Sequence, residues 1–301
     1  MSLITTSVIS NALKETLDQV WTDQSKGTLQ WESLGFKVTN TTDNFVDDVE
    51  YAGLGLAVVK PEGQQIAVDS IQQGYPTRYW SLTYALGFVV SEEAIADNKY
   101  DKAIDQAGQL SRSMKLTQEY LAANVFINSF SSSYVGGDGV SLCSASHKLP
   151  KGGTYSNQFS TAMSFSETAV ETMVVNLSKL PSSNGLIVGG YNLKHVVVPK
   201  ELMFRAARVL KSDLQNDTAN NAINVLKKDF SIGYVSNAYL TSSTNWWGVT
   251  DADNGLRWIW RQKPRFNTHN TEDNMTMRAN ANMRILGPGW SNPRGVYGSN
   301  I

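Results

Sequence analysis

Cys143, His147 and Asp138 are the residues of this sequence whose types and spacing most resemble a reactive site. The single cysteine lies four residues before one of only three histidines, and the aspartate precedes both. A thiol beside an imidazole that a carboxylate orients is the arrangement of a cysteine nucleophile. Such partners usually come from distant parts of a chain. The spacing therefore leaves a Cys/His hydrolase as an alternative to a packed cysteine and a histidine that hydrogen-bonds its loop.

Other catalytic and cofactor signatures are missing from the sequence. It holds no GxxxxGK[ST], GxGxxG or HExxH pattern, and the glycine-rich run GGDGVSLC lacks the lysine of a phosphate loop. One cysteine and three histidines leave no disulfide framework and no recognisable metal-ligand spacing. We therefore predict no catalytic residue, no metal site, no cofactor and a non-enzymatic protein.

Composition and charge narrow the classes of partner. The 301 residues are 41% apolar, enough for a buried core, and 26 Lys and Arg nearly cancel 27 Asp and Glu. Because no basic surplus exists to displace counterions, we expect only weak, non-specific contact with nucleic acid. The sequence shows neither a signal peptide nor an apolar run of roughly 18 residues, so we expect no membrane partner and assembly in a cytoplasm.

The first half of the chain reads as an arm, a hairpin and a long helix. Residues 1–50 are polar, with a short amphipathic stretch from Leu13 to Trp21, and are expected to form an extended arm or a disordered tail. From residue 51 to 90, the β-like runs YAGLGLAVV and IAVDSI flank the turn Lys60-Pro61-Glu62-Gly63 and predict a projecting hairpin. Ser91 is a candidate cap for a helix over 91–129, with two shorter helices as the alternative because Gly108 interrupts the pattern.

The second half mixes helices and strands. A Gly/Ser-rich loop leads to a helix that Ser164 or Ser166 caps and Pro181 ends. HVVV is expected as a buried strand and ELMFRAARVLKS as a helix, while DLQNDTANNAIN is expected as a loop. Strands are expected around Ile232, Tyr239 and Trp247, over 256–260 and over 276–285, before a Gly/Pro tail. The fold class is therefore α+β, without repeats or a linker between autonomous domains.

Two segments resemble the major head proteins of Mu-like phages, a branch of the HK97-like capsid family. The first carries the resemblance at Asp138, Gly139, Leu142, His147, Gly152, Gly153 and Asn157. The second carries it at Val196 to Pro199, Glu201, Leu202, Ala206 and Leu210. The sequence departs from the family at Lys148, where Pro commonly follows the His, and at Cys143, where an aromatic residue is common.

The resemblance implies an HK97-like capsid fold. Its parts would be an N-terminal arm over 1–48, an E-loop hairpin over 49–90, a peripheral domain with a long spine helix over 91–135 and 255–301, and an axial domain over 136–254. It further implies a major capsid protein that assembles with itself into hexamers and pentamers of an icosahedral shell around the phage genome. A nanocompartment shell of the encapsulin type is the alternative within the same fold.

The resemblance also implies partners and a location. They would be portal, scaffold or maturation protease, and decoration proteins, in a virion assembled in the host cytoplasm. Lys60 and Glu62 at the hairpin turn would contact a neighbouring subunit. Lys60 is expected as a solvated turn lysine, although one branch of the family uses such a residue in an isopeptide crosslink. His147 and Asn157 are expected to hold the loop that joins the spine helix to the axial domain.

Charge is unevenly distributed along the chain. Residues 1–50 carry three lysines against eight carboxylates, a net charge of −5, whereas residues 251–301 carry seven basic residues against four acidic ones, a net charge of +3. We predict that the opposite charges guide the arm onto a neighbouring subunit. The residues chosen to test this are Asp43, Asp47, Asp48, Arg261 and Arg265. The alternative is that they are ordinary solvated charges, each exposed pair contributing ~0–1 kcal/mol.

Overall fold

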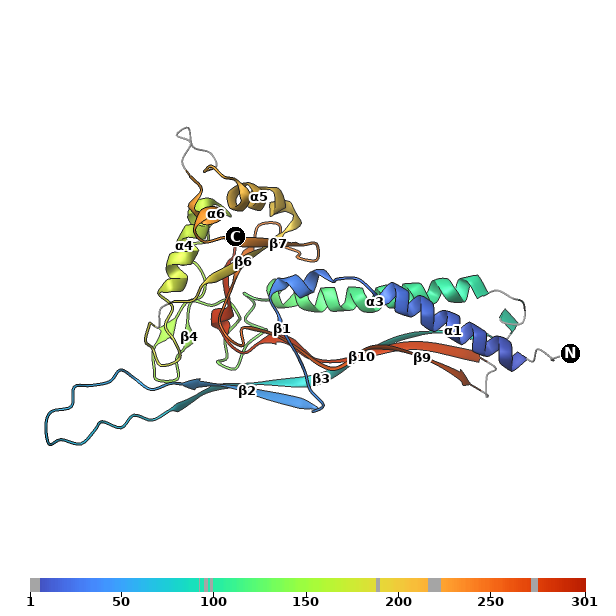
Figure 1. The fold of residues 1–301 in the computed structure, drawn as a ribbon, viewed down its shortest axis with the longest axis horizontal. Coiled ribbons are helices and arrows are strands. Elements are labelled where there is room, and N and C mark those ends of the chain that lie inside the picture. The colour runs from blue at the N-terminus through green and yellow to red at the C-terminus, as the bar shows by residue number, and fades with distance from the viewer. Residues whose placement is uncertain are drawn as a thin grey trace.

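A computed structural model describes residues 6–91, 93–94, 97, 100–187, 190–215, 223–271 and 276–301. Figure 1 shows an elongated molecule in which a long twisted sheet runs along one side, with two helices beside it. A second α/β body rises near one end of that sheet, and a thin loop extends from the same end. The layout is mixed α and β, as the sequence predicted.

The long sheet has the strand order β1-β9-β10-β3-β2. Its members are β1 (Lys37–Asn40), β2 (Phe45–Ala52), β3 (Gln72–Ser91), β9 (Leu256–Thr271) and β10 (Thr276–Trp290). β10 lies at the centre and pairs antiparallel with both β9 and β3. Met277, Ala279, Ala281, Met283 and Ile285 alternate along it and are buried, as expected for one face of a strand that packs on a core.

Two helices, α1 (Thr6–Ser25) and α3 (Tyr100–Ile127), pack on each other beside this sheet. The expectation of one long helix is confirmed, but α3 begins at Tyr100. Ser91 Oγ accepts a hydrogen bond from Ala94 N at 3.3 Å, whereas Glu92 lies outside the described residues. Gly108 does not break α3. It lies on the face of α3 that packs on α1, where its Cα side is turned toward Val20 and Gln24.

The expectation of an extended or disordered arm is wrong for much of residues 1–50. Leu13, Leu17 and Trp21 are spaced four residues apart, so they lie on one face of α1, and all three are buried. Farther along, the backbone N–H groups of Gln30 and Trp31 both donate to the Glu119 carboxylate of α3. The segment does need another surface, and its own chain supplies one in α3 and the sheet.

Aromatic side chains fill the core between helices and sheet. Trp31, in the 3-10 helix η1 (Gln30–Leu34), stacks on Trp258 with ring centroids 4.0 Å apart. Phe36 meets both Trp258 and Phe126 edge to face. Such contacts add to the burial of apolar area, so these tryptophans stabilise the core between the helices and the sheet.

The second body is built on the sheet β11-β8-β6-β7. Its strands are β6 (Leu193–Pro199), β7 (Gly233–Asn237), β8 (Trp246–Thr250) and β11 (Val296–Ser299), and its helices are α4 (Glu167–Ser178), α5 (Met203–Lys211) and α6 (Val225–Lys228). Short elements complete it: β4 (His147–Lys148), β5 (Thr154–Tyr155), η2 (Lys200–Leu202) and η3 (Pro293–Gly295). Ser166 caps α4 by accepting from Ala169 N, and both the HVVV strand and the helix after it are confirmed.

Several predicted strands are wrong. Residues 53–59 and 66–71 form no strand, because the hairpin pairs only where β2 meets β3, and a two-stranded ribbon without a packed face is marginal in water. The strand predicted around Ile232 is present as β7, which begins at Gly233, whereas Tyr239 lies in no strand. The Gly/Pro tail contains β11, which pairs with β8. Most of the loop predicted over 213–224 lies outside the described residues.

Candidate functional site

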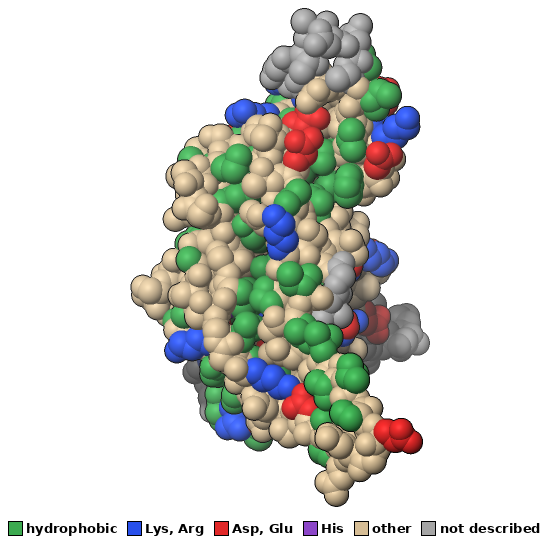
Figure 2. All heavy atoms as spheres, turned by 90° about the vertical axis from the view of Figure 1, so that its left-hand side faces the viewer, with side chains coloured by type: hydrophobic (Ala, Val, Ile, Leu, Met, Phe, Trp, Pro, Cys, Tyr) green, Lys and Arg blue, Asp and Glu red, His purple; other side chains and the backbone are tan. Residues whose placement is uncertain are grey.

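The loop between β2 and β3 is the most exposed apolar segment that the structure describes. Every residue from 53 to 71 is exposed, Val59 to 92% and Val68 to 95% of their full areas. The large apolar side chains in it are Leu54, Leu56, Val58, Val59, Ile66, Val68 and Ile71. Figure 2 views the molecule from this end and shows hydrophobic side chains at the surface of its lower part. A loop of this composition, without a core of its own, is typical of a surface that another protein covers.

The base of this loop is fixed by a buried guanidinium. Arg294, in η3, is 1% exposed and donates to Glu50 Oε1 of β2 at 2.7 Å and to the Pro181 carbonyl at 2.7 Å. Its guanidinium also lies 4.4 Å from the centre of the Tyr155 ring. The Ser183 hydroxyl donates to the same glutamate. β2, the second body and the C-terminal segment are therefore joined at one point.

A second set of contacts holds the start of the loop. Asp69 accepts from Gly55 N at 2.7 Å, pairs with Lys151 at 3.0 Å and accepts from Ser70 N. The Gly55 hydrogen bond and then the lysine lower the pKa of Asp69 to about 2. Asn184 Nδ2 donates to the Leu54 carbonyl at 3.1 Å. These contacts direct the loop away from the body and leave residues 56–59 free.

Cys143 and His147 do not form a nucleophile and base. Burial raises the pKa of the Cys143 thiol above its ordinary value, so it stays protonated. The His147 ring is instead bonded on both sides, with Nδ1 2.6 Å from Asp138 Oδ2 and Nε2 3.1 Å from Asn157 Oδ1. The sequence correctly grouped Asp138 with His147, but the geometry gives that pair a structural partner in Asn157.

Asn157 links this loop to the C-terminal segment. Its Nδ2 donates to the carbonyls of Leu142, Pro293 and Val296 at 2.7, 2.9 and 2.9 Å, and its Oδ1 accepts from Ser144 N. Asn157 and His147 are both fully buried. Because two of these bonds reach Pro293 and Val296 near the end of the chain, Asn157 fixes where the loop after α3 crosses the C-terminal segment.

The residues singled out for charge have partners within the chain. Asp47 forms a bidentate pair with Arg78 at 2.6 and 2.7 Å, which lowers the pKa of Asp47, and Asp48 pairs with Arg257 at 2.7 Å. Asp43 shares a hydrogen bond with Thr41. Arg261 and Arg265 donate to the side chains of Asn44 and Asn282. Asn44 and Asp48 thus lie beside Arg261 and Arg257 of β9 in the same subunit.

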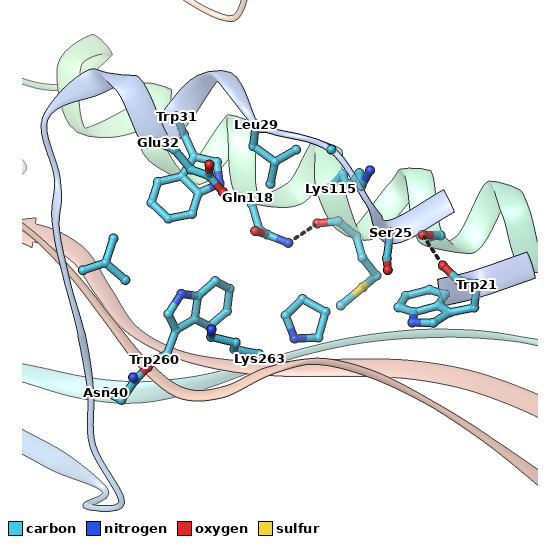
Figure 3. Close-up of a pocket in the computed structure, with 15 residues that line it drawn as sticks. Trp21, Ser25, Leu29, Trp31, Glu32, Asn40, Lys115, Gln118, Trp260 and Lys263 are labelled. Atoms are coloured by element: carbon cyan, nitrogen blue, oxygen red, sulfur yellow. Dashed lines mark hydrogen bonds between the residues drawn. The ribbon is translucent and has the colours of Figure 1, made fainter. Parts of the chain in front are cut away.

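A groove between α3 and the sheet is a concave feature beside the core. Figure 3 shows Trp31 on the helical side and Trp260 on the sheet side of a space of about 480 Å³. Its charged lining is Glu32, Lys115 and Lys263. Lys115 donates to the Lys26 carbonyl, and Gln118 to the Met114 carbonyl. The two serine hydroxyls of the lining, Ser25 and Ser111, donate to the backbone carbonyls of Thr22 and Trp21.

Across the described ranges, no three His, Cys, Asp or Glu side chains come together as a metal site. No described helix is both long enough and apolar enough to cross a bilayer.

Sequence reasoning missed Glu50 and Arg294, which are 244 positions apart. No local pattern marks either of them. Arg294 falls in a Gly/Pro-rich tail that reads as irregular, and only the folded structure shows that the tail is buried.

Comparison with solved structures places the fold among capsid proteins. The capsid of a native GTA particle matches with a TM-score of 0.55 at 15% identity, covering 91% of each chain. The procapsid of bacteriophage JBD30 matches with a TM-score of 0.53 at 13% identity, covering 99% of this chain and 76% of that one. A virus-like particle from Pyrococcus furiosus matches with a TM-score of 0.53 at 12% identity, covering 95% and 98%.

At these identities the structural matches establish the HK97-like fold, and the Mu-like branch stays a prediction. The comparison with curated protein sequences found no match. A family model described as phage capsid protein matches residues 81–299, which is most of the chain. The chain belongs to the phage capsid protein family.

Proposed function

We propose that this capsid protein is the major subunit of an icosahedral phage head and forms hexamers and pentamers. In this proposal residues 1–48 form the arm, 49–90 the E-loop hairpin, 91–135 with 255–301 the peripheral domain, and 136–254 the axial domain. Capsomers close around the axial domains, and each hairpin reaches over a neighbouring subunit. Identical subunits in closed rings build such a shell without any catalytic step.

The exposed loop carries this proposal. Burying a Val, Leu or Ile side chain fully stabilises a protein by roughly 1.5–3 kcal/mol relative to leaving it exposed. The apolar side chains of residues 53–71 therefore contribute none of this stabilisation in the isolated subunit. A neighbouring subunit that covers them recovers it. Lys60 and Glu62 are exposed in the same loop and would set its polar contacts with that neighbour.

The wider assembly follows from the same proposal. Portal, scaffold or maturation protease, and decoration proteins would act on the shell, which assembles in the host cytoplasm and becomes part of the virion. The near-zero net charge favours only weak contact with packaged DNA. No cofactor takes part, and the subunit performs no catalysis.

Removal of residues Val59 to Gln65 tests the proposal. We expect the shortened protein to keep its circular dichroism spectrum and unfolding midpoint, because this segment packs on nothing in its own subunit, but to form no closed particles in electron micrographs. The matched control changes Gln64 and Gln65 to Ser, which keeps the length and the apolar side chains, and should assemble like the parent. Normal particles from the shortened protein would show that the loop does not join subunits.

A further inference from the structure

The second half of β3 is a free sheet edge. Residues 72–80 pair with β2, whose first residue, Phe45, lies opposite Trp80, and within the described residues 82–91 pair only with β10. Leu82, Leu86 and Val89 on this stretch are each at least half exposed. Every second N–H and C=O of such a strand points outward and is available to another strand.

The opposite edge of the same sheet is protected. Beyond Trp260, opposite which β1 ends, the outer edge of β9 has no partner strand among the described residues, and this part of the strand contains Arg261, Lys263, Pro264 and Arg265. Charged residues and proline are the usual means by which proteins prevent a further strand from pairing at an edge. From Tyr79 to Ser91, β3 has no charged residue and no proline. One edge of the sheet therefore discourages strand addition, and the other permits it.

The exposed loop contains a segment suited to that edge. Leu54, Leu56 and Val58 alternate with glycine and alanine, which gives an extended chain one apolar and one small face. β3 has the same pattern, with Leu82 and Leu86 on one face and Ala85 and Gly87 on the other. The backbone of residues 56–59 makes no hydrogen bond with the rest of the described chain. One subunit thus presents an extended segment without a partner and a strand with one unpaired edge. Both are uncharged, and their apolar and small residues alternate in a similar way.

These two strands cannot meet within one subunit. Figure 1 shows the loop leaving the end of β3 that holds Gln72 and pointing away from the sheet, while the free edge lies toward the other end of β3. At about 3.3 Å per residue, the 20 residues of β3 span roughly 66 Å. The loop of a second copy, placed head to tail, has no such restriction. A head-to-tail contact is also the kind that closes rings.

We infer that residues 56–59 of one subunit add as a strand to the free edge of β3, residues 82–91, in a second copy of the chain. The inference rests on the proposed shell function and names the surface that receives the loop. Backbone hydrogen bonds supply the pairing, and the apolar face of the added strand extends the row of Leu82 and Leu86. Because neither strand carries a charge, pairing leaves no buried charge without a partner.

Crosslinking between two differently marked subunits tests the contact directly. One population carries Leu56→Cys, the other Leu86→Cys, and the mixture is assembled and treated with a short bifunctional thiol reagent. We expect a crosslinked dimer on denaturing gels, with buried Cys143 taking no part. Replacing the second population by Thr268→Cys, on the protected edge, should abolish the dimer. Equal crosslinking at both edges, or dimers from Leu86→Cys alone, would overturn the inference, the latter by showing β3 paired with β3.

Blocking the edge gives a second test with a closely matched control. Leu86 of β3 lies opposite Ala281 of β10, and Thr268 of β9 lies opposite Ala279. The two side chains are therefore on the same face of the sheet, one on each side of β10. We expect Leu86→Lys to slow assembly, measured by light scattering, by about tenfold or more, because a lysine at the edge opposes strand addition. Thr268→Lys should stay within about twofold of the parent because that edge is already protected.

The outcomes separate the two proposals. If the parent protein forms no closed shells, the proposed function fails. The inference alone is overturned by a different set of results. In that set the parent assembles and removal of Val59 to Gln65 prevents assembly, yet Leu86→Lys assembles at the parent's rate and the Leu56→Cys and Leu86→Cys variants do not crosslink. The loop would then join subunits at a surface other than β3.

Discussion

At the scale of single residues, His147 and Asn157 act as a buried connection between distant segments. The family resemblance singled out both positions, and the structure shows why those side chains are needed there. Asn157 donates to three carbonyls and accepts from Ser144 N and His147. Both N–H groups and both oxygen lone pairs of its side-chain amide therefore have partners. Asp138 completes the set from the other side of the imidazole ring.

We predict that His147→Ala lowers the free energy of unfolding by about 2–4 kcal/mol, because it leaves Asp138 and Asn157 each short of a buried partner. Urea titration followed by tryptophan fluorescence measures the change. Ser146→Ala, at the exposed neighbouring position, should stay within about 0.5 kcal/mol of the parent. Unchanged stability in His147→Ala, or a hydrolase activity lost specifically in it, would contradict the structural role.

At the scale of elements, glycines show how closely helices and strands approach. A side chain at Gly108 of α3 would meet Val20 and Gln24 of α1 no nearer than 3.9 Å, an ordinary contact. At Gly298 of β11, a Cβ would lie 2.7 Å from both Cys143 Sγ and Phe130 Cζ. The α1–α3 contact therefore has room for a methyl group, whereas the contact of β11 with the loop after α3 has none.

Alanine at these two positions should have opposite effects. Gly108→Ala is expected to raise the free energy of unfolding by about 0.5–1 kcal/mol, because alanine favours the helical backbone. Gly298→Ala is expected to lower it by about 1–3 kcal/mol, because buried neighbours must shift. Thermal unfolding of both variants beside the parent measures the pair. A loss of stability in Gly108→Ala would mean that α1 packs more tightly on α3 than the structure indicates.

At the scale of the whole molecule, the charge difference between the two ends of the chain has an intramolecular use. Asp48 pairs with Arg257 in a largely buried contact, and Asp47 pairs with Arg78 across β2 and β3. Asp43 has no ion pair among the described residues. The prediction that acidic arm residues guide neighbouring subunits must therefore be tested on Asp43 alone as well as on all three aspartates, because substitution of Asp47 or Asp48 also breaks an ion pair within the subunit.

We expect that reversing Asp43, Asp47 and Asp48 to Lys slows or misdirects assembly, and that Arg261→Glu with Arg265→Glu in the same chain partly restores it. Complementary charge acts mainly on encounter and is screened beyond about 8 Å at physiological salt, so the effect should shrink as salt rises. Light scattering at low and moderate salt measures the rates. Asp43→Lys alone is the informative control, because it keeps both intramolecular pairs. Equal rates for the parent and the triple variant would refute guidance by the arm.

The main helices, the buried strands and the class of protein could be predicted from the sequence alone. Ser166 caps α4 through its own hydroxyl, the apolar residues of α3 recur at helical spacing, and missing catalytic motifs are visible without a fold. Periodicity and capping depend on residues a few positions apart, so a linear reading detects them. The two motif segments carried the capsid resemblance for the same reason.

Which segments gain a partner depends on contacts that form only in the folded protein. The run 53–59 has a strand-like pattern yet pairs with nothing, whereas the Gly/Pro tail contains a buried arginine and a strand. Arg294 meets Glu50 from 244 positions away, and the free edge of β3 exists because the first residue of β2 lies opposite Trp80. Strand pairing and burial depend on contacts between distant parts of the chain, whose formation the local pattern of either part does not encode.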